Sequence, residues 1–157
     1  MRSIYKIVVC SLLTLSITSC EKDLLEKEQY QKEIYLIGAY NRVWTTEVSY
    51  SNEEVKTYFT VSSSGTLALD RDVNVKMKIN EELVDIYNKK YWTVLNEDKY
   101  YKSLDTDLYS IPSLENTVIK HAEGISAEVP VLIKTASLKI DQSYVIPVEI
   151  ELSLIHI

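Results

Sequence analysis

Alternation of apolar and polar side chains is strongest between residues 72 and 79. The apolar positions in this stretch are Val73, Val75, Met77 and Ile79. Because successive side chains of a strand point to opposite faces, a period of two predicts a half-buried β-strand with one face toward a core. The same signal, in shorter or weaker form, predicts further strands at 35–40, 55–61, near 100–101, and at 117–121, 125–133 and 144–151.

The hydrophobic period changes to 3.6 after Ile79. Asn80 is a suitable N-cap, acidic residues follow it, and lysines stand about ten residues later, as the helix dipole favours. The pattern therefore predicts a helix of about ten residues with Leu83, Ile86 and Tyr87 as its buried stripe.

About seven short strands with one short helix insertion predict an all-β fold, an antiparallel β-sandwich. Ser62–Gly65 has the composition of a turn. Pro130 and Pro147 cannot donate to a strand ladder, so we expect their strands to lie at an edge or to contain a bulge.

The N-terminus has the order of a secretory signal. Arg2 and Lys6 precede an apolar run over 7–17, which is too short for a helix that crosses a membrane, since that needs roughly 20 residues. Residues 17–20 read I-T-S-C and resemble the bacterial lipobox, whose cysteine receives lipid and becomes the first mature residue. We expect a lipidated Cys20 to tether the chain to a membrane. The alternative is an ordinary signal in which this cysteine stands by chance.

These features divide the chain into four parts. We predict a lipoprotein signal peptide at 1–19, a charged tether at 20–33, a sandwich domain at 34–151 and a non-native tail at 152–157. The tail, L-S-L-I-H-I, matches the translation of a transposase end sequence used to build sequencing libraries. If so, the natural protein continues beyond Glu151, with a C-terminal domain that is missing here; the alternative is a genuine strand end.

Length, net charge and cysteine content exclude several classes of function. The chain has 157 residues, enough for one domain of ordinary size, and a net charge of −6. This charge argues against a nucleic-acid partner, because phosphate binding rests on clustered Lys and Arg. Cys10 lies in the predicted signal and Cys20 in the lipobox, so the mature domain would have no thiol for disulfides, metal sites or catalysis. We expect no cofactor.

The order of these features resembles a known family. Residues 79–88 read I-N-x-x-L-V-x-x-Y-N and residues 144–150 read Y-x-I-P-V-x-I. With the lipobox, this is similar to the N-terminal domain catalogued as domain of unknown function 1735 (DUF1735), found in surface lipoproteins of Bacteroidetes. The resemblance implies an immunoglobulin-like sandwich that precedes a carbohydrate-binding or family 18 type glycoside hydrolase domain. Glu21 and Asp23 resemble the export signal to the outer face of the outer membrane in that phylum.

Aromatic residues are the candidates for ligand binding. The rings in predicted loops or at strand ends are Trp44, Tyr50, Tyr91, Trp92, Tyr100, Tyr101 and Tyr109. Flat rings can stack on sugar faces while their polar atoms bond outward, and we take Trp92, Tyr91 and Trp44 as tentative ligand-binding residues. Packing in the core explains tyrosines equally well.

Catalytic patterns are weak. Glu53–Glu54 and Glu81–Glu82 are adjacent acids, which we interpret as solvated charges and not as the separated pair of a glycosidase. Asp70-x-Asp72-x-Asn74 imitates a calcium loop but lacks its glycine, and Asp105-x-Asp107 alone supplies too few oxygens. His121 has no serine in a Gly-x-Ser-x-Gly motif to accompany it. We therefore predict no catalytic residue and no metal site.

Three hypotheses follow. The leading one is a non-enzymatic, lipid-anchored module on the cell exterior that supports glycan binding. The second is the N-terminal, non-catalytic domain of a truncated surface glycoside hydrolase. The third is a structural or adhesive subunit that pairs through its edge strands.

Overall fold

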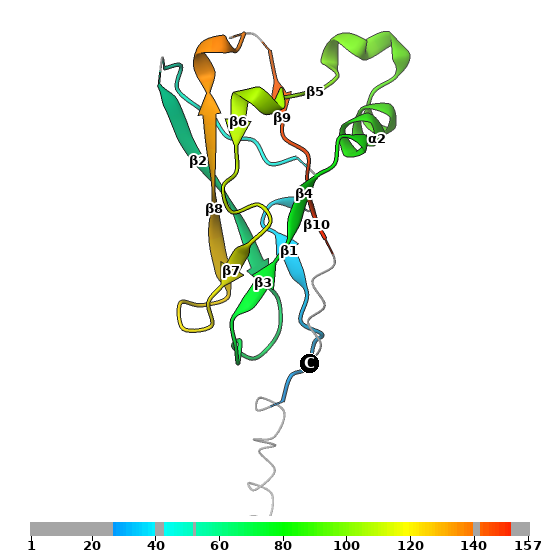
Figure 1. Ribbon diagram of the computed structural model, residues 1–157. Helices are drawn as coiled ribbons and strands as arrows, with labels where there is room; N and C mark the ends of the chain where they lie inside the picture. Colours follow the sequence, from blue (N-terminus) through cyan, green and yellow to red (C-terminus); the bar gives the residue numbers. More distant parts are fainter. Residues whose placement is uncertain (1–26, 40–42, 52, 140–141, 152–157) are drawn as a thin grey trace, which may run out of the picture.

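The computed structural model describes residues 27–39, 43–51, 53–139 and 142–151 (Figure 1). The described residues form ten strands: β1 (Ile34–Leu36), β2 (Glu54–Ser63), β3 (Val73–Val75), β4 (Met77–Ile79), β5 (Lys102–Ser103), β6 (Tyr109–Ser110), β7 (Thr117–Ile119), β8 (Ser126–Lys134), β9 (Tyr144–Val145) and β10 (Val148–Ile150). The helical elements are α2 (Glu82–Tyr91) and the 3-10 helices η3 (Val94–Lys99), η4 (Thr106–Leu108) and η5 (Thr135–Ser137).

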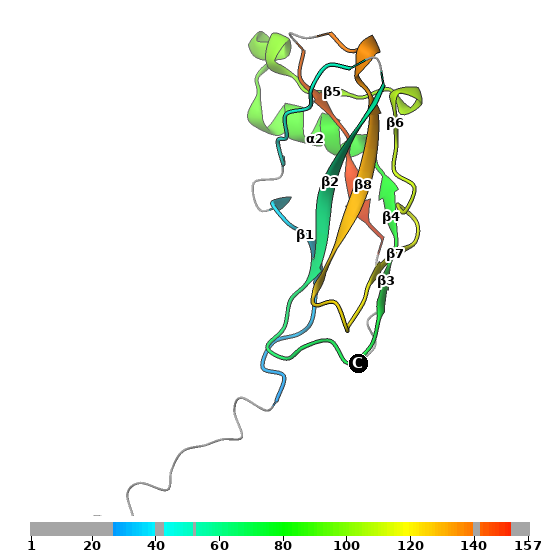
Figure 2. The ribbon, with the colours of Figure 1, turned by 90° about the vertical axis from the view of Figure 1, so that its left-hand side faces the viewer.

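The strands pack in two layers. One layer is a four-stranded sheet in the order β1-β2-β8-β6, and the other contains the pairs β3–β7 and β4–β10. Figure 2 shows the long β2–β8 pair on one side of the molecule and β3, β4 and β7 on the other. The predicted all-β, immunoglobulin-like antiparallel sandwich with one short helix insertion is confirmed. The pair β5–β9, which is parallel, is an exception to the antiparallel pairing.

The core lies between the layers. Val61 and Val129 come from the large sheet, and Val75, Met77 and Ile119 come from the opposite layer. All five side chains are almost completely buried. Removing this apolar area from water is the main favourable term that holds the two layers together.

β2 confirms the alternation predicted for 55–61 but extends beyond it. Besides β1, it pairs with β8, in a register that runs from Glu54 opposite Lys134 to Ser62 opposite Ser126. The turn predicted at Ser62–Gly65 is wrong at its start, because Ser62 and Ser63 belong to β2 and are buried. The backbone N–H of Ser63 and the hydroxyl of Ser62 both donate to the carbonyl of Ile125, at 2.8 and 3.1 Å.

The predicted strand 72–79 changes partner at Lys76. β3 pairs with β7 and β4 pairs with β10, so one alternating stretch serves two ladders. At the junction the Lys76 carbonyl accepts from Glu151 N–H, and Met77 N–H donates to the Leu114 carbonyl, each at 2.9 Å. The side-chain alternation continues across the junction, so the apolar face is buried as predicted.

The two prolines have different effects. Pro147 separates β9 from β10, so the strand predicted at 144–151 is interrupted, and its carbonyl accepts from Asn80 N–H at 2.9 Å. Pro130 is in β8, an inner strand of the sheet, and lies opposite Tyr58 of β2. The expectation that the strand of Pro130 lies at an edge of the sheet is therefore wrong. β6 pairs only with Leu132 and Ile133, which leaves Pro130 without a ladder partner on that side.

The helix predicted after Asn80 is confirmed, but of its predicted buried stripe only Tyr87 is even half-buried. Asn80 Oδ1 accepts from Glu82 N–H at 3.2 Å, which satisfies one free donor of the first turn. Leu83 and Ile86 are 37% and 58% exposed. The buried helix residues are Val84 and Asn88, which are four residues apart and therefore lie on one face.

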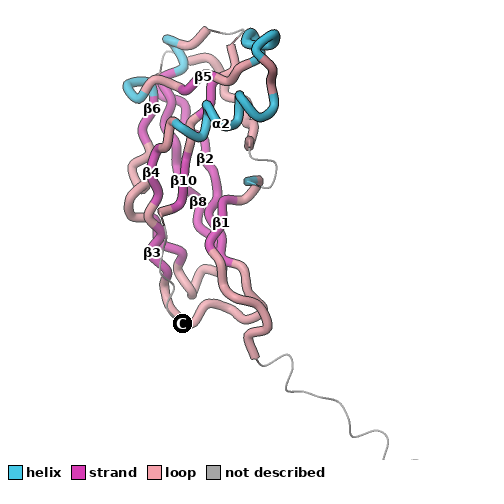
Figure 3. Tube along the Cα trace, turned by 90° about the vertical axis from the view of Figure 1, so that its right-hand side faces the viewer, coloured by secondary structure: helices cyan, strands magenta, loops and turns pink. Residues whose placement is uncertain are grey.

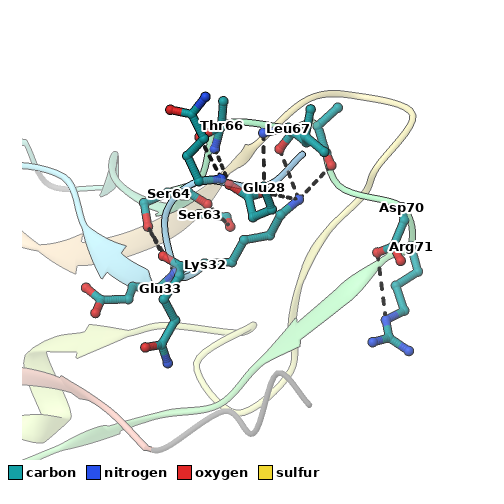
Figure 4. Close-up of polar contacts among 12 residues, drawn as sticks. Glu28, Lys32, Glu33, Ser63, Ser64, Thr66, Leu67, Asp70 and Arg71 are labelled. Carbon is teal, nitrogen blue, oxygen red and sulfur yellow. Dashed lines mark hydrogen bonds and ion pairs between the residues drawn. The ribbon is translucent and has the colours of Figure 1, made fainter. Parts of the chain in front are cut away.

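Residues 28–33 of the predicted tether form a strap that is bonded to the loop 64–68 (Figure 4). The Glu28 carboxylate accepts from the N–H groups of Thr66 and Leu67, the second at 3.3 Å. Lys32 Nζ donates to the carbonyls of Leu67 and Ala68, at 3.0 and 2.6 Å, and lies 3.4 Å from Glu28. The strap therefore enters β1 in a fixed direction.

Gly65 allows this close approach. Its φ of +130° is a conformation that residues with a Cβ rarely adopt. A Cβ at this position would stand 2.9 Å from Lys32 Cγ and 3.1 Å from a Glu28 carboxylate oxygen. The loop can pass under the strap because this residue has no side chain.

The strap should respond to acid. The Thr66 N–H, followed by weaker contributions from Leu67 and Lys32, lowers the pKa of Glu28 below 4.5. A group with a lowered pKa in the folded state stabilises that state when it is ionised, and the stabilisation is lost as the pH falls through the lowered pKa. We expect the NMR amide shift of Thr66 to titrate with a midpoint below pH 4.5 and to stop doing so in Glu28→Gln.

Glu33→Gln is the matched control for this titration. Glu33 lies on the same strap but contacts Ser64 through its backbone N–H and carbonyl. The control should keep the wild-type titration of the Thr66 amide. A wild-type midpoint at or above 4.5 would contradict the bonding of the strap described above.

Candidate functional site

The insertion between β4 and β5, residues 80–101, lies at the end of the sandwich opposite the strap. Figure 3 shows α2 beside β5 and β6 at this end, while residues 27–33 lead away from the other. The insertion contains α2 and η3, and it carries Tyr91 and Trp92, the two leading candidates for ligand binding. Its geometry therefore decides what these rings can contact.

Asn88 fixes the insertion to the sandwich. This side chain is 4% exposed, and its amide makes two hydrogen bonds to one backbone residue. Nδ2 donates to the Tyr101 carbonyl at 2.9 Å, and Oδ1 accepts from the Tyr101 N–H at 3.0 Å. The amide thus takes the place of a neighbouring strand for Tyr101 and closes the loop of residues 89–100.

Three tyrosine rings stack along the helix. The ring centroids of Tyr87 and Tyr91 are 4.5 Å apart, and those of Tyr87 and Tyr101 are 5.6 Å apart in an edge-to-face arrangement. Both distances lie in the range where aromatic pairs attract each other. Tyr91 is the outermost ring of the three and remains 47% exposed. With Lys90 Nζ, which lies 5.7 Å from the Tyr91 ring centroid, the stack orients this half-exposed ring at the end of the helix.

Trp92 follows the helix and is half-buried. Lys99 Nζ lies 5.6 Å from the Trp92 ring centroid, a cation–π distance that holds the lysine head near the indole. The indole Nε1 is buried and has no hydrogen-bond partner in the described part of the chain. Val94 and Leu95, which follow Trp92 closely in the sequence, are among the most exposed apolar side chains.

Trp44 is held at a different place. It is 57% exposed, and its ring lies against Gly38, where a Cβ would come within 2.5 Å of ring atom Cε3. Gly38 has a φ of +86°, so both its conformation and this contact require glycine. Among the described residues no ring contact joins Trp44 to Tyr91 or Trp92. Its role in ligand binding stays a prediction.

The other candidate rings differ in exposure. Tyr50 is 60% exposed. Tyr101 packs in the tyrosine stack. The Tyr109 hydroxyl is buried without a partner among the described residues, and burial, followed by the nearby Glu81 charge, raises the pKa of Tyr109. Tyr109 packs in the second core cluster, with Val131 and Ile133. Packing, the alternative considered for these tyrosines, therefore accounts for Tyr101 and Tyr109.

An open depression of about 370 Å³ lies beside the insertion. Its lining residues are Asp98, Lys99, Tyr100, Lys139, Gln142 and Ser143. Of these, sequence patterns singled out only Tyr100. The others are polar surface residues from two distant segments, and nothing in their spacing along the chain indicates that they meet.

Two of the acidic candidates, Glu81 and Asp105, make local hydrogen bonds. Ser103 Oγ donates to the Glu81 carboxylate. Asp105 accepts from Asp107 N–H at 3.2 Å, as the cap of η4. Within the described ranges, no group of three or more His, Cys, Asp or Glu side chains is arranged to hold a metal ion.

Asp72, from the calcium-like pattern, pairs with His121. Asp72 Oδ1 accepts from the His121 N–H at 3.0 Å and lies 2.7 Å from His121 Nδ1. The His121 side chain and backbone hydrogen bonds hold the pKa of Asp72 below its ordinary value of 3.8. Both side chains are exposed, so this pair ties the start of β3 to the end of β7 at the surface.

Cys20 and the rest of the predicted lipobox lie outside the described residues, as does the predicted tail 152–157. A separate finding concerns helices: none in the described part of the chain is both long and apolar enough to cross a membrane.

Comparisons relate the chain to known proteins. A family model whose description ends in "-like, N-terminal domain" matches residues 30–153, which is more than half of the chain. A comparison with curated proteins gave no match.

Three crystal structures of Bacteroides ovatus proteins have similar folds. One, described as structural genomics, unknown function, is 14% identical with a TM-score of 0.60 over 77% of this chain. A multidomain protein including DUF1735 is 16% identical with a TM-score of 0.56 over 64%. A protein of unknown function is 22% identical with a TM-score of 0.53 over 64%. This chain spans 40%, 33% and 30% of their respective lengths, and at these identities the likeness concerns the fold.

The Asn88 bridge can be tested by substitution. Asn88→Ala leaves the N–H and carbonyl of Tyr101 without their partners, so we expect the free energy of unfolding to fall by about 1–3 kcal/mol in urea denaturation. Amide hydrogen exchange at Tyr101 should become faster. Asn116→Ala, at an exposed asparagine, should change stability by less than about 0.5 kcal/mol. Equal stability of the two variants would show that the bridge does not hold the insertion.

Proposed function

Because the chain belongs to the family of DUF1735-like N-terminal domains, we propose that it is a lipid-anchored, non-catalytic module that presents its Tyr91–Trp92 end to glycans at the cell surface. The observation that carries this proposal is the separation of the two ends of the sandwich. The strap lies at one end, and α2, which ends at the exposed Tyr91, lies at the other (Figure 1).

The direction of the chain supports the anchoring part of the proposal. Residues 27–33 lie at the end opposite α2 (Figure 2). A lipid on Cys20, seven residues before Lys27, would therefore hold the sandwich by this end. The end with the insertion would then point away from the membrane.

The aromatic surface supports the glycan part. Tyr91 is exposed and is oriented by its stack on Tyr87, so little conformational entropy would be lost when a sugar ring packs on it. Val94 and Leu95, close by in the sequence, are also exposed, and exposed apolar side chains that gather in one patch mark interaction sites. The non-catalytic role rests on the sequence, where the acidic pairs are adjacent and His121 has no nucleophile pattern beside it.

A second candidate is an N-terminal, non-catalytic module ahead of a glycoside hydrolase domain. The lengths of the similar structures favour it, because this chain spans 40% or less of each, and one of them is described as multidomain. In this arrangement the sandwich would be a non-catalytic accessory to the catalytic domain.

Glycan binding is tested with the full chain in detergent on a glycan array. We expect binding, and we expect Tyr91→Ala to weaken it at least tenfold because a stacking face is lost. Tyr58→Ala is the matched control, since Tyr58 is similarly exposed on β2, and it should bind as the wild type does. Absence of any bound glycan, or unchanged binding by Tyr91→Ala, would refute the proposal.

Anchoring is tested by expression of the full chain in a Bacteroidetes host that is fed an alkyne fatty acid. We expect the label on the wild type and none on Cys20→Ala. The wild type should also sediment with outer membranes and be digested by protease added to intact cells. An unlabelled wild type, or equal labelling of both proteins, would remove the lipid anchor from the proposal.

A further inference from the structure

The depression beside η3 joins two segments of the chain. Asp98, Lys99 and Tyr100 come from the end of η3 and the residue after it, and Lys139, Gln142 and Ser143 precede β9. Lys99 lines the depression and also lies 5.6 Å from the Trp92 ring centroid, so this lysine links the depression to the aromatic residues proposed above to bind glycans. A ligand that stacks on the aromatic surface could therefore extend toward these polar groups.

The charge of the lining is opposite to that of the chain. Among the described residues that line the depression, two are lysines and one is an aspartate, whereas the whole chain has a net charge of −6. A local positive site on an acidic protein attracts an anionic group and leaves the rest of the surface repulsive to it.

Both lysines are available. Elsewhere four lysines lie within 4 Å of a carboxylate: Lys32, Lys76, Lys78 and Lys120. In the ranges the structure describes, no carboxylate is within ion-pair distance of Lys99 or Lys139. An incoming carboxylate would therefore not have to displace an existing partner.

The neutral lining suits a sugar ring. Tyr100, Gln142 and Ser143 supply a phenol, an amide and a hydroxyl, which can donate to and accept from sugar hydroxyls. The volume of about 370 Å³ is at the small end of ligand sites, which suits one or two sugar residues.

We infer that this depression binds the carboxylate of an acidic sugar residue, a uronic or sialic acid, through Lys99 and Lys139. The inference rests on the proposed function, since it assigns the sugar class of the same surface. Lys99 is the better placed of the two lysines, because its cation–π contact with Trp92 keeps its head group beside the aromatic surface.

The test measures binding of the full chain to oligosaccharides that contain galacturonic, glucuronic or sialic acid, each beside its methyl ester. The ester keeps the sugar and removes the charge. We expect at least one acid to bind at least tenfold more tightly than its ester, with an affinity that falls as salt increases. The double variant Lys99→Gln/Lys139→Gln should bind that acid and its ester equally.

Lys56→Gln is the matched control. Lys56 Nζ lies 5.0 Å from the Tyr58 ring centroid, so it resembles Lys99 in its cation–π contact but stands on β2. It should keep the preference for the acid. If acid and ester bind equally to the wild type, or if the double variant keeps the preference, the inference fails while glycan binding stands. If no acidic or neutral glycan binds at all, the proposed function fails with it.

Discussion

The paired hydrogen bonds between the Asn88 amide and the Tyr101 backbone hold the insertion in its place. A buried backbone N–H and carbonyl must have partners, and at Tyr101 a side chain provides both. The bridge brings the two ends of a loop together, so that Trp92 and Lys99 can meet across it. It also turns the helix so that Val84 and Asn88 face the sandwich, which leaves Ile86 exposed on the opposite side.

The same constraint explains the error in the predicted helix face. Hydrophobicity ranks Leu83 and Ile86 above asparagine for burial, so a pattern of apolar residues selects their side of the helix. The bonds of Asn88 to Tyr101 select another side, and they depend on a residue thirteen positions away. By contrast, the alternation in 72–79 correctly predicted burial, because a strand that covers a core has its period set by local geometry. The change of partner at Lys76 depends on Glu151 and Leu114, and no local signal reports it.

The aromatic and charged parts of the site differ in how far they can be predicted. Tyr91 and Trp92 follow a recognisable helix, so their position at its end could be foreseen. Lys99 and Lys139 are separated by about 40 residues, and their approach depends on how η3 and the segment before β9 lie on the sandwich. Lysines in loops are common, and only the folded chain shows which of them converge without a neutralising partner.

The strap has a mechanical consequence. Tension applied at residue 27 would reach the sandwich first through Glu28 and Lys32, whose bonds to the loop 64–68 lie ahead of β1. That loop directly continues β2, so the load would pass into the longest ladder of the sheet, where many bonds share it. When the chain is pulled from this end, the hydrogen bonds of the Glu28 carboxylate would break before any strand separates.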